Sequence, residues 1–327
     1  MRAVYITEFG APENLEIREA ATPSKPDNTK VLVRVEAVGL NRADLLQVAG
    51  MYPPPAGYSP NIPGLEFAGE VAEIGSEVTK WKTGDRVFGI VAGESQAEFL
   101  LTDESLIARI PDNLSFTEAA AVPEAFITAN DAIFTLGNLS EGKTLLIHAV
   151  GSGVGLAGLQ IAKAKGATVI GTSRTADKLQ KCSAFGLDLG LTTPEPIFAE
   201  SVLEKTNGRG VDVILDLVGG AYFEQNLASL ATKGRLILVG LTSGRIAEFN
   251  LGMALQKRAS IIGTMLRGRP NSEKAEATRL FADEVVPLLA NGAVVPNVDR
   301  VYPVSDVIDA YNYLRSNESF GKIVLEF

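Results

Sequence analysis

The sequence predicts an α/β protein in which a doubly wound parallel-sheet domain is inserted into a β-rich domain. Short alternating segments fill the chain up to residue 122, and longer units follow in which apolar runs alternate with amphipathic segments. The chain then closes with one more strand pattern, GKIVLEF at 321–327, too far on to belong simply to the alternating block. We therefore expect residues 1–122 and 263–327 to form the β-rich domain and residues 123–262 to form the inserted one.

The first 122 residues contain apolar–polar alternation punctuated by Gly and Pro. Examples are VLVRVEAVG at 31–39, FAGEVAEIG at 67–75 and GDRVFGI at 84–90. Alternation with a period of two predicts strands, and the short connections predict an antiparallel sheet.

From residue 123 the pattern changes to helices and apolar strands in turn. A helix with a proline near its start is predicted over 123–134. Strands are predicted at 144–149, 168–173, 211–219 and 235–240, and helices at 154–166, 175–186, 196–208, 222–234 and 273–290. Apolar strands separated by helices are typical of a parallel sheet covered on both faces.

The composition favours a small-molecule partner. The 30 basic and 39 acidic side chains give a net charge of −9, which argues against binding to nucleic acid or to an anionic membrane. The single cysteine, Cys182, excludes an internal disulfide and a multi-thiolate metal site, and it suits a reducing compartment. Because no secretory signal and no run of 18 apolar residues is visible, we expect a cytoplasmic protein.

A glycine-rich turn lies between a predicted strand and a predicted helix. The strand TLLIHA leads into Gly153-x-Gly155-x-x-Gly158. Glycines at such a turn let a pyrophosphate approach the backbone N–H groups at the positive end of the helix, which predicts a Rossmann dinucleotide site. The alternative is that these glycines serve only strand–helix packing.

The end of the next strand predicts which dinucleotide binds. An NAD site usually carries an acidic residue here for the ribose 2′-OH, but this chain has Ser173, Arg174 and Lys178 in GTSRTADK. A hydroxyl and two cations suit a 2′-phosphate, so we predict NADPH as the cofactor. An ordinary solvated helix start is the alternative for the two cations.

Several motifs together resemble the medium-chain dehydrogenase/reductase superfamily and its zinc-free quinone oxidoreductase group. They are NRADLLQVAGMYPPP, IPGLEFAGEV, PEAFITA, HAVGSGVG, GLDLG, GRGVDVILDLVGG and the closing GKIVLEF. Within that group the chain is most similar to the branch containing the tumour-suppressor-inducible quinone reductase. The resemblance runs end to end, and it implies a GroES-like catalytic domain around the Rossmann domain and a homodimer.

The same resemblance points away from zinc chemistry. Zinc alcohol dehydrogenases place a cysteine where this chain has Asn41, and Gly-His-Glu where it has Gly64, Leu65 and Glu66. One histidine and one cysteine cannot readily rebuild a catalytic zinc site. We therefore expect zinc-independent hydride transfer from NADPH to a quinone. The alternatives are an enoyl or alkenal reductase and a non-catalytic NADPH-binding protein with a structural or nucleic-acid-binding role.

The resemblance also implies the catalytic residues: Tyr52, Asn41, Asp44 and Gln47. Tyr52 is the expected hydrogen-bond or proton donor to the substrate oxygen, with aromatic packing as the alternative. Asn41 is expected to donate a hydrogen bond or to form a turn. Asp44 is expected to orient the loop or to take part in function, and for Gln47 a solvated helix position is the alternative.

The expected cofactor-binding residues lie at the glycine turn, at strand ends and near the C-terminus. They are Thr128, Ser152, Gly153, Val154, Gly155, Ser173, Arg174, Lys178, Val218, Leu241, Thr242, Met265, Leu266, Arg267 and Asn317. For Thr128 a core position is the alternative, for Ser152 a plain turn, for Arg267 a surface or interface position, and for Asn317 a C-terminal turn. Thr193 stands where relatives commonly place a tyrosine near the adenine, so stacking there is not expected. His148 lies inside an apolar strand and is expected to be structural.

Overall fold

The computed structural model describes all 327 residues, and the chain divides into two compact units. The first contains Met1–Ile127, Leu266–Gly292 and Pro296–Phe327, and the second contains Thr128–Met265 and Ala293–Val295. The second unit is thus inserted into the chain of the first, and the two main crossings follow Ile127 and Met265.

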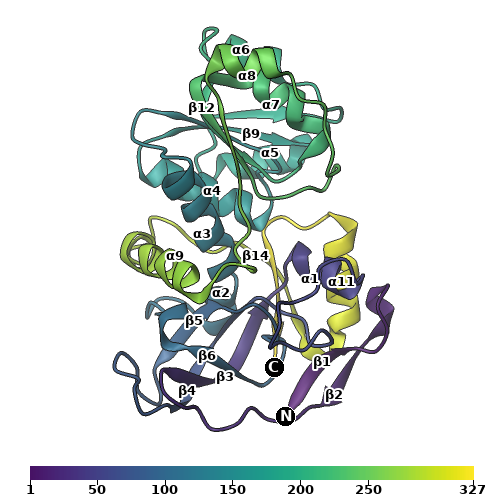
Figure 1. Cartoon of the computed structure of the whole chain (residues 1–327), viewed down its shortest axis with the longest axis vertical. Coiled ribbons are helices and arrows are strands. Elements are labelled where there is room, and N and C mark those ends of the chain that lie inside the picture. Colours follow the sequence, from purple (N-terminus) through teal and green to yellow (C-terminus); the bar gives the residue numbers. More distant parts are fainter. The chain divides into compact units, whose positions relative to one another are not determined.

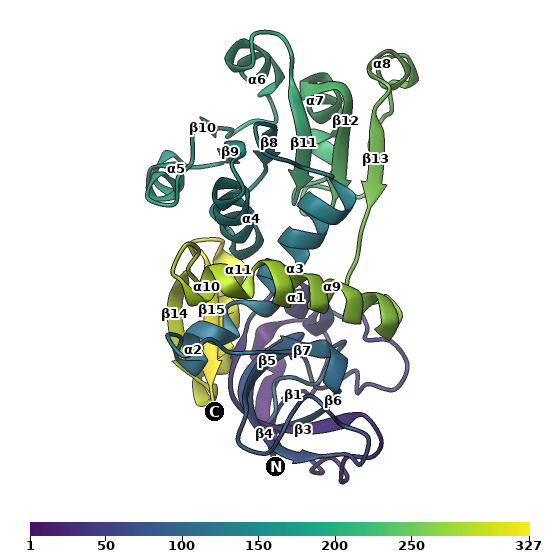
Figure 2. The same ribbon diagram turned by 90° about the vertical axis from the view of Figure 1, so that its left-hand side faces the viewer.

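The first unit is built on a mostly antiparallel sheet. Its strands are β1 (Arg2–Ile6), β2 (Leu15–Glu19), β3 (Lys30–Gly39), β4 (Glu66–Ile74), β5 (Arg86–Ile90), β6 (Phe99–Asp103), β7 (Ile107–Arg109), β14 (Val298–Pro303) and β15 (Lys322–Glu326). Seven of them form one sheet in the order β14-β15-β3-β4-β5-β7, with β6 also paired to β3, while β1 and β2 pair separately. The C-terminal β15 lies antiparallel to β3, so the end of the chain completes the N-terminal sheet, as the sequence predicted (Figure 2).

Strand β3 pairs with β4, β6 and β15, and most of its residues are buried. Val31, Val33 and Val35 are at most 3% exposed, whereas Arg34 between them is exposed. Tyr311, on the C-terminal helix, is fully buried in the same core. The helices of this unit are α1 (Arg42–Val48), α2 (Phe116–Ala120), α9 (Asn271–Glu284), α10 (Val286–Ala290) and α11 (Val307–Ser316), and α3 (Pro123–Asn130) begins in it.

The second unit is a six-stranded sheet in which every pairing is parallel. Its strands are β8 (Thr144–Ile147), β9 (Thr168–Ser173), β10 (Leu189–Thr192), β11 (Val211–Asp216), β12 (Leu230–Leu238) and β13 (Ser260–Gly263). Their order is β10-β9-β8-β11-β12-β13. Successive strands are added on one side of β8 as far as β10 and then on its other side from β11, so the order of the strands reverses between β8 and β11. This is the Rossmann order, and it places a ligand crevice at the carboxyl ends of the strands beside that reversal.

Helices cover both faces of the parallel sheet (Figure 1). They are η3 (Asp131–Leu136), α4 (Gly153–Ala164), α5 (Ala176–Ser183), α6 (Ala199–Lys205), α7 (Phe223–Ser229) and α8 (Leu251–Lys257). Leu146 and Ile214 belong to the apolar cluster that contains Val202 of α6. Ile147 and Leu215, one residue further along each strand, face Gly158 of α4 instead. The strands are buried on both sides, which explains their continuous apolar sequence.

Several elements differ from the sequence prediction. The helix expected over 222–234 ends at Ser229, because Leu230 already pairs with Val211 of the neighbouring strand. The helix expected over 273–290 begins at Asn271 and is divided into α9 and α10 near Pro287, a residue that has no N–H to continue the helical hydrogen bonds. The sequence analysis did not predict strands β10, β13 and β14 or helices α8 and α11. No helix in the chain is both long and apolar enough to span a bilayer.

Candidate active site

The end of β3 and the start of α1 are held by a cap. The backbone N–H of Asn41 donates to Asp44 Oδ2 at 2.7 Å, which is the acidic half of a capping box. The Asn41 side chain is used elsewhere: its Nδ2 donates to Glu66 Oε1 at 2.8 Å. The predicted segment NRAD therefore forms a rigid helix start beside β4.

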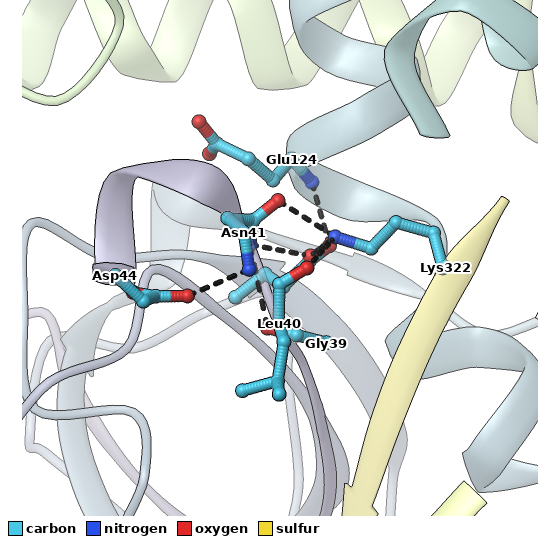
Figure 3. A network of polar contacts seen from close by, with 7 residues as sticks. Gly39, Leu40, Asn41, Asp44, Glu124 and Lys322 are labelled. Carbon is cyan, nitrogen blue, oxygen red and sulfur yellow. Dashed lines mark hydrogen bonds and ion pairs between the residues drawn. The ribbon is translucent and has the colours of Figure 1, made fainter. Parts of the chain in front are cut away.

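A buried ion pair lies at the centre of this region (Figure 3). The ammonium group of Lys322 donates to Glu66 Oε1 at 2.5 Å, to Asn41 Oδ1 at 2.6 Å and to the carbonyl of Leu40 at 2.8 Å. Both charged side chains are buried, and the three ammonium protons have three acceptors. A Cβ atom at Gly39 would lie 2.4 Å from Glu66 Oε1, so only glycine allows this close approach.

Asp44 is fully buried, and this sets its protonation. Its Oδ1 has no hydrogen-bond partner. Desolvation raises the pKa of Asp44 to about 7, against the opposing effects of the Asn41 hydrogen bond and of the charges of Lys322 and Arg267. Asp44 is therefore shielded from solvent, and its observed hydrogen bond is the one that its Oδ2 accepts from the backbone N–H of Asn41.

Arg267 holds the loop that carries Tyr52. Its Nε donates to the carbonyl of Ala92 at 2.7 Å, its Nη1 donates to the carbonyl of Tyr52 at 2.9 Å, and its Nη2 donates to Gln47 Oε1. Gln47 in turn donates to the carbonyl of Pro60 at 3.0 Å. Arg267 and Gln47 are both buried, so the surface position that was the alternative for Arg267 and the solvated position that was the alternative for Gln47 are not observed.

Tyr52 is the partly exposed member of this group. The guanidinium carbon of Arg267 lies 4.9 Å from the centre of its ring, and three prolines follow it in the chain. The hydroxyl of Tyr52 makes no hydrogen bond to the protein. Burial raises the pKa of Tyr52 above 10, the charge of Arg267 opposes this rise, and Glu124 adds to it.

Glu124, in the first turn of α3, adds a carboxyl group to the same region. Its backbone N–H donates to Glu66 Oε2 at 2.9 Å. Burial, followed by the charge of Glu66, raises the pKa of Glu124 to about 8, although Lys322 and Arg267 oppose this. The side chain nevertheless remains partly exposed.

The glycine turn of the second unit has the expected construction. Ser152 caps α4, and its Oγ accepts a hydrogen bond from Gly155 N–H at 3.1 Å. A Cβ atom at Gly155 would lie 2.6 Å from the carbonyl oxygen of Ala149, and one at Gly158 would lie 2.8 Å from Ile133 Cδ1. Gly155 and Gly158 therefore permit close packing, and Gly153 and Val154 are the first two residues of the helix.

The residues expected to choose the dinucleotide follow β9. Ser173 ends this strand and its Oγ accepts a hydrogen bond from Thr175 N–H at 3.3 Å. Arg174 is exposed, and Lys178 is partly exposed on α5. Ser173 and Arg174 are consecutive, so the end of the strand carries a hydroxyl followed directly by a cation, with no acidic residue at either position.

The other expected cofactor-binding residues are divided between the units: Leu266 and Asn317 belong to the first unit, and the rest belong to the second. Val218 donates its N–H to Asp216 Oδ1 at 2.8 Å just after β11. Leu241 and Thr242 are exposed after β12, and Met265 is exposed after β13. Thr128 is a partly buried residue of α3, and Leu266 is a buried residue next to Arg267 in the chain. Asn317 has a left-handed backbone conformation at the end of α11 and accepts a hydrogen bond from Arg42.

His148 is structural in this fold, as expected. Asn226 Nδ2 donates to Asp216 Oδ2 at 2.9 Å, so Asn226 Oδ1 must accept from His148 Nε2, 2.6 Å away. Burial lowers the pKa of His148, so the ring is neutral and its Nδ1 accepts from the Thr172 hydroxyl at 2.9 Å. The histidine side chain therefore joins Thr172 of β9 to Asn226 of α7, and Asn226 in turn bonds to Asp216 at the end of β11.

Comparison with known proteins gives the family. A "Zinc-binding dehydrogenase" model matches residues 153–283, and an "Alcohol dehydrogenase GroES-like domain" model matches residues 27–130. The chain is 32% identical to a quinone oxidoreductase of Pseudomonas aeruginosa, over 99% of each chain. It belongs to the medium-chain dehydrogenase/reductase superfamily. Within that superfamily it is a quinone oxidoreductase-like protein.

Solved members of the superfamily share the whole fold. A mycobacterial protein complexed with NADPH has a TM-score of 0.89 at 29% identity, with all of both chains covered. An NAD-dependent alcohol dehydrogenase has a TM-score of 0.88 at 30% identity, also over both full chains. The CurK enoyl reductase has a TM-score of 0.87 at 27% identity and covers 99% of this chain and 98% of its own. A nicotinamide cofactor is therefore expected for this superfamily member.

Sequence reasoning missed two groups of this superfamily member's site. Glu124 and Lys322 were read only as parts of the helix PEAFITA and of the strand GKIVLEF. A proline followed by an acid at a helix start is common, and one lysine at the start of a strand is not diagnostic. The signal that could have found Lys322 is a charged residue at the start of an otherwise apolar strand, because such a residue needs a partner when it is buried. No comparable signal marks Glu124, which lies at a helix start. No group of three or more His, Cys, Asp or Glu side chains in the chain is placed to hold a metal ion.

Proposed function

We propose that this protein is a zinc-independent reductase that uses NADPH to reduce a quinone. The observation that carries the proposal is the ammonium group of Lys322, which bonds to Asn41 and Glu66. Asn41 stands where zinc alcohol dehydrogenases have a cysteine, and Leu65, the residue before Glu66, stands where they have a histidine and carries no ligand atom. A catalytic zinc usually needs three protein ligands, and the groups present are already engaged by an ammonium ion. The chemistry then suits a conjugated carbonyl, which carries its own electron sink.

The second unit supports binding of the dinucleotide. Its phosphates would lie on the first turn of α4, at Ser152, Gly153, Val154 and Gly155, where a side chain at Gly155 would be excluded. Ser173, Arg174 and Lys178 would receive the 2′-phosphate. When bound, NADPH supplies the hydride.

The structure suggests different roles for the four expected catalytic residues. We assign substrate contact to Tyr52, whose hydroxyl has no protein partner and whose side chain is partly exposed. Asp44 and Gln47 are buried and engaged with the chain, so we assign them the positioning of the loop. We assign both roles to Asn41, because its side chain is partly exposed and could contact the substrate, and it is also hydrogen-bonded to Lys322 and Glu66. Arg267 likewise becomes a positioning residue.

Reduction of an enoyl or alkenal substrate is the second candidate. It uses the same hydride and the same proton donors, and a solved relative of 27% identity is an enoyl reductase. A panel of acceptors distinguishes the candidates: 1,2-naphthoquinone, 1,4-benzoquinone and an α,β-unsaturated aldehyde, each followed by loss of NADPH absorbance. We expect the quinones to give the highest kcat/KM. Measurable NADPH binding without turnover of any acceptor would favour the non-catalytic alternative.

A homodimer formed through the second unit is also proposed. Strand β13 is an edge of the parallel sheet, and the neighbouring segment exposes Ile246 (92%), Leu251 (72%) and Leu255 (80%). An uncovered strand edge beside exposed apolar side chains is suited to pairing with a second copy. Light scattering coupled to gel filtration should give twice the chain mass of 34.6 kDa, and a monomer mass would contradict the proposal.

A further inference from the structure

The carboxyl group of Glu124 is held in place by its backbone and free at its end. The backbone N–H is fixed by Glu66 at 2.9 Å, within the network around Lys322. Figure 3 shows the carboxyl group pointing away from that network. Its two oxygens accept no hydrogen bond from the protein, and the side chain is partly exposed, so a ligand can reach it. A carboxyl group that is positioned but unpartnered is available to bind a substrate oxygen.

The groups around Glu124 do not compete with it as proton donors. Six titratable groups interact electrostatically with Glu124, so that the charge of one shifts the pKa of the other. They are Glu66 of β4, Lys322 of β15, Asp44 of α1, Lys274 of α9, Arg267 and Tyr52. Lys322 and Arg267 already donate to protein acceptors. Asp44 and Lys274 are at most 4% exposed, so they do not reach a substrate.

The two partly exposed acids differ in the ease with which they lose a proton. The pKa of Tyr52 is raised above 10, whereas that of Glu124 is about 8. At neutral pH Glu124 is therefore mostly protonated, and it is the stronger acid of the two. A general acid works best when its pKa lies near the working pH, which favours Glu124 as the donor.

We propose that the Glu124 carboxyl group donates the proton that completes reduction of the substrate, while the Tyr52 hydroxyl hydrogen-bonds the same substrate. This rests on the proposed function. Reduction of a quinone to a hydroquinone takes two electrons and two protons, and the hydride from NADPH brings both electrons and one proton. The second proton passes from the Glu124 oxygen to the substrate oxygen, where the new O–H bond forms. The carboxylate left behind is reprotonated from water, which its partial exposure allows.

The test is the variant Glu124→Gln, which keeps the shape of the side chain and removes the acid. Glu273→Gln is the matched control, because Glu273 also lies in the first turn of a helix and is exposed. We expect single-turnover quinone reduction by the wild type and the control to fall as pH rises through about 8, since the acid must be protonated. Glu124→Gln should be slower by about 10²-fold or more and lose this fall, with unchanged Kd for NADPH. Glu124→Asp should recover part of the rate.

A second readout needs no turnover. Infrared difference spectra of the free protein should show a carboxyl group that titrates near pH 8 and disappears in Glu124→Gln. A variant with the wild-type rate and the wild-type pH profile would overturn the inference while leaving the proposed function intact. Failure of the wild type to reduce any quinone would instead refute the proposed function, and the infrared titration would still test the acidity of Glu124.

Discussion

Replacing Lys322 with methionine is the strongest perturbation of the site that the structure suggests. The change keeps most of the side-chain volume and removes the ammonium group that bonds to Leu40, Asn41 and Glu66. The carboxylate of Glu66, which is 0% exposed, would then remain buried with only the N–H groups of Asn41 and Glu124 as partners. Removing one member of a buried ion pair typically costs about 3–5 kcal/mol, because the remaining charge is uncompensated.

The assay is urea unfolding followed by circular dichroism and by Trp81 fluorescence, which reports on the first unit. Thermal unfolding of the same samples should show a fall in Tm of about 6–20 °C, which corresponds to this cost for a domain of this size. The double variant Glu66→Gln with Lys322→Met should recover most of the loss, because it leaves no isolated charge. A loss of less than about 1 kcal/mol for the single variant would refute the reasoning, since it would mean that the ion pair is not buried in solution.

Two further substitutions test the assigned roles. Arg174→Ala should raise KM for NADPH by about 10- to 150-fold and leave KM for NADH unchanged, because a charge-assisted hydrogen bond to a 2′-phosphate accounts for roughly 1.5–3 kcal/mol. Steady-state kinetics with both cofactors measures this, and equal effects on the two would contradict it. Tyr52→Phe should lower kcat about tenfold with little change in Kd for NADPH, because one substrate hydrogen bond is lost. An unchanged kcat would remove Tyr52 from the mechanism.

The fold could be predicted because its local signals agree with its tertiary environment. Strands buried on both faces read as apolar runs, and Gly155 and Gly158 lie where a helix must approach a strand. Strand β10 escaped prediction because it is short and only alternately buried. The division between α9 and α10 depends on Pro287, which the sequence shows but the broad helical pattern concealed.

The site was predictable only where its residues are neighbours in the sequence. The segment from Asn41 to Tyr52 was found as one block. Its partners come from far away: Glu66 pairs with Lys322, 256 positions later, and Gln47 bonds to Arg267, 220 positions later. No local pattern encodes such contacts, because they arise when β15 pairs with β3 and when the chain returns to the first unit at Leu266.

The most direct test of the proposed function is quinone reduction by the protein after treatment with a strong metal chelator. The assay compares kcat/KM for NADPH and NADH with 1,2-naphthoquinone, before treatment, after treatment and after addition of zinc. If the ammonium group of Lys322 takes the place of a metal among these side chains, the rate with NADPH will be unchanged throughout and will exceed the rate with NADH. Loss of activity on chelation, with recovery on adding zinc, would contradict the account, as would a preference for NADH.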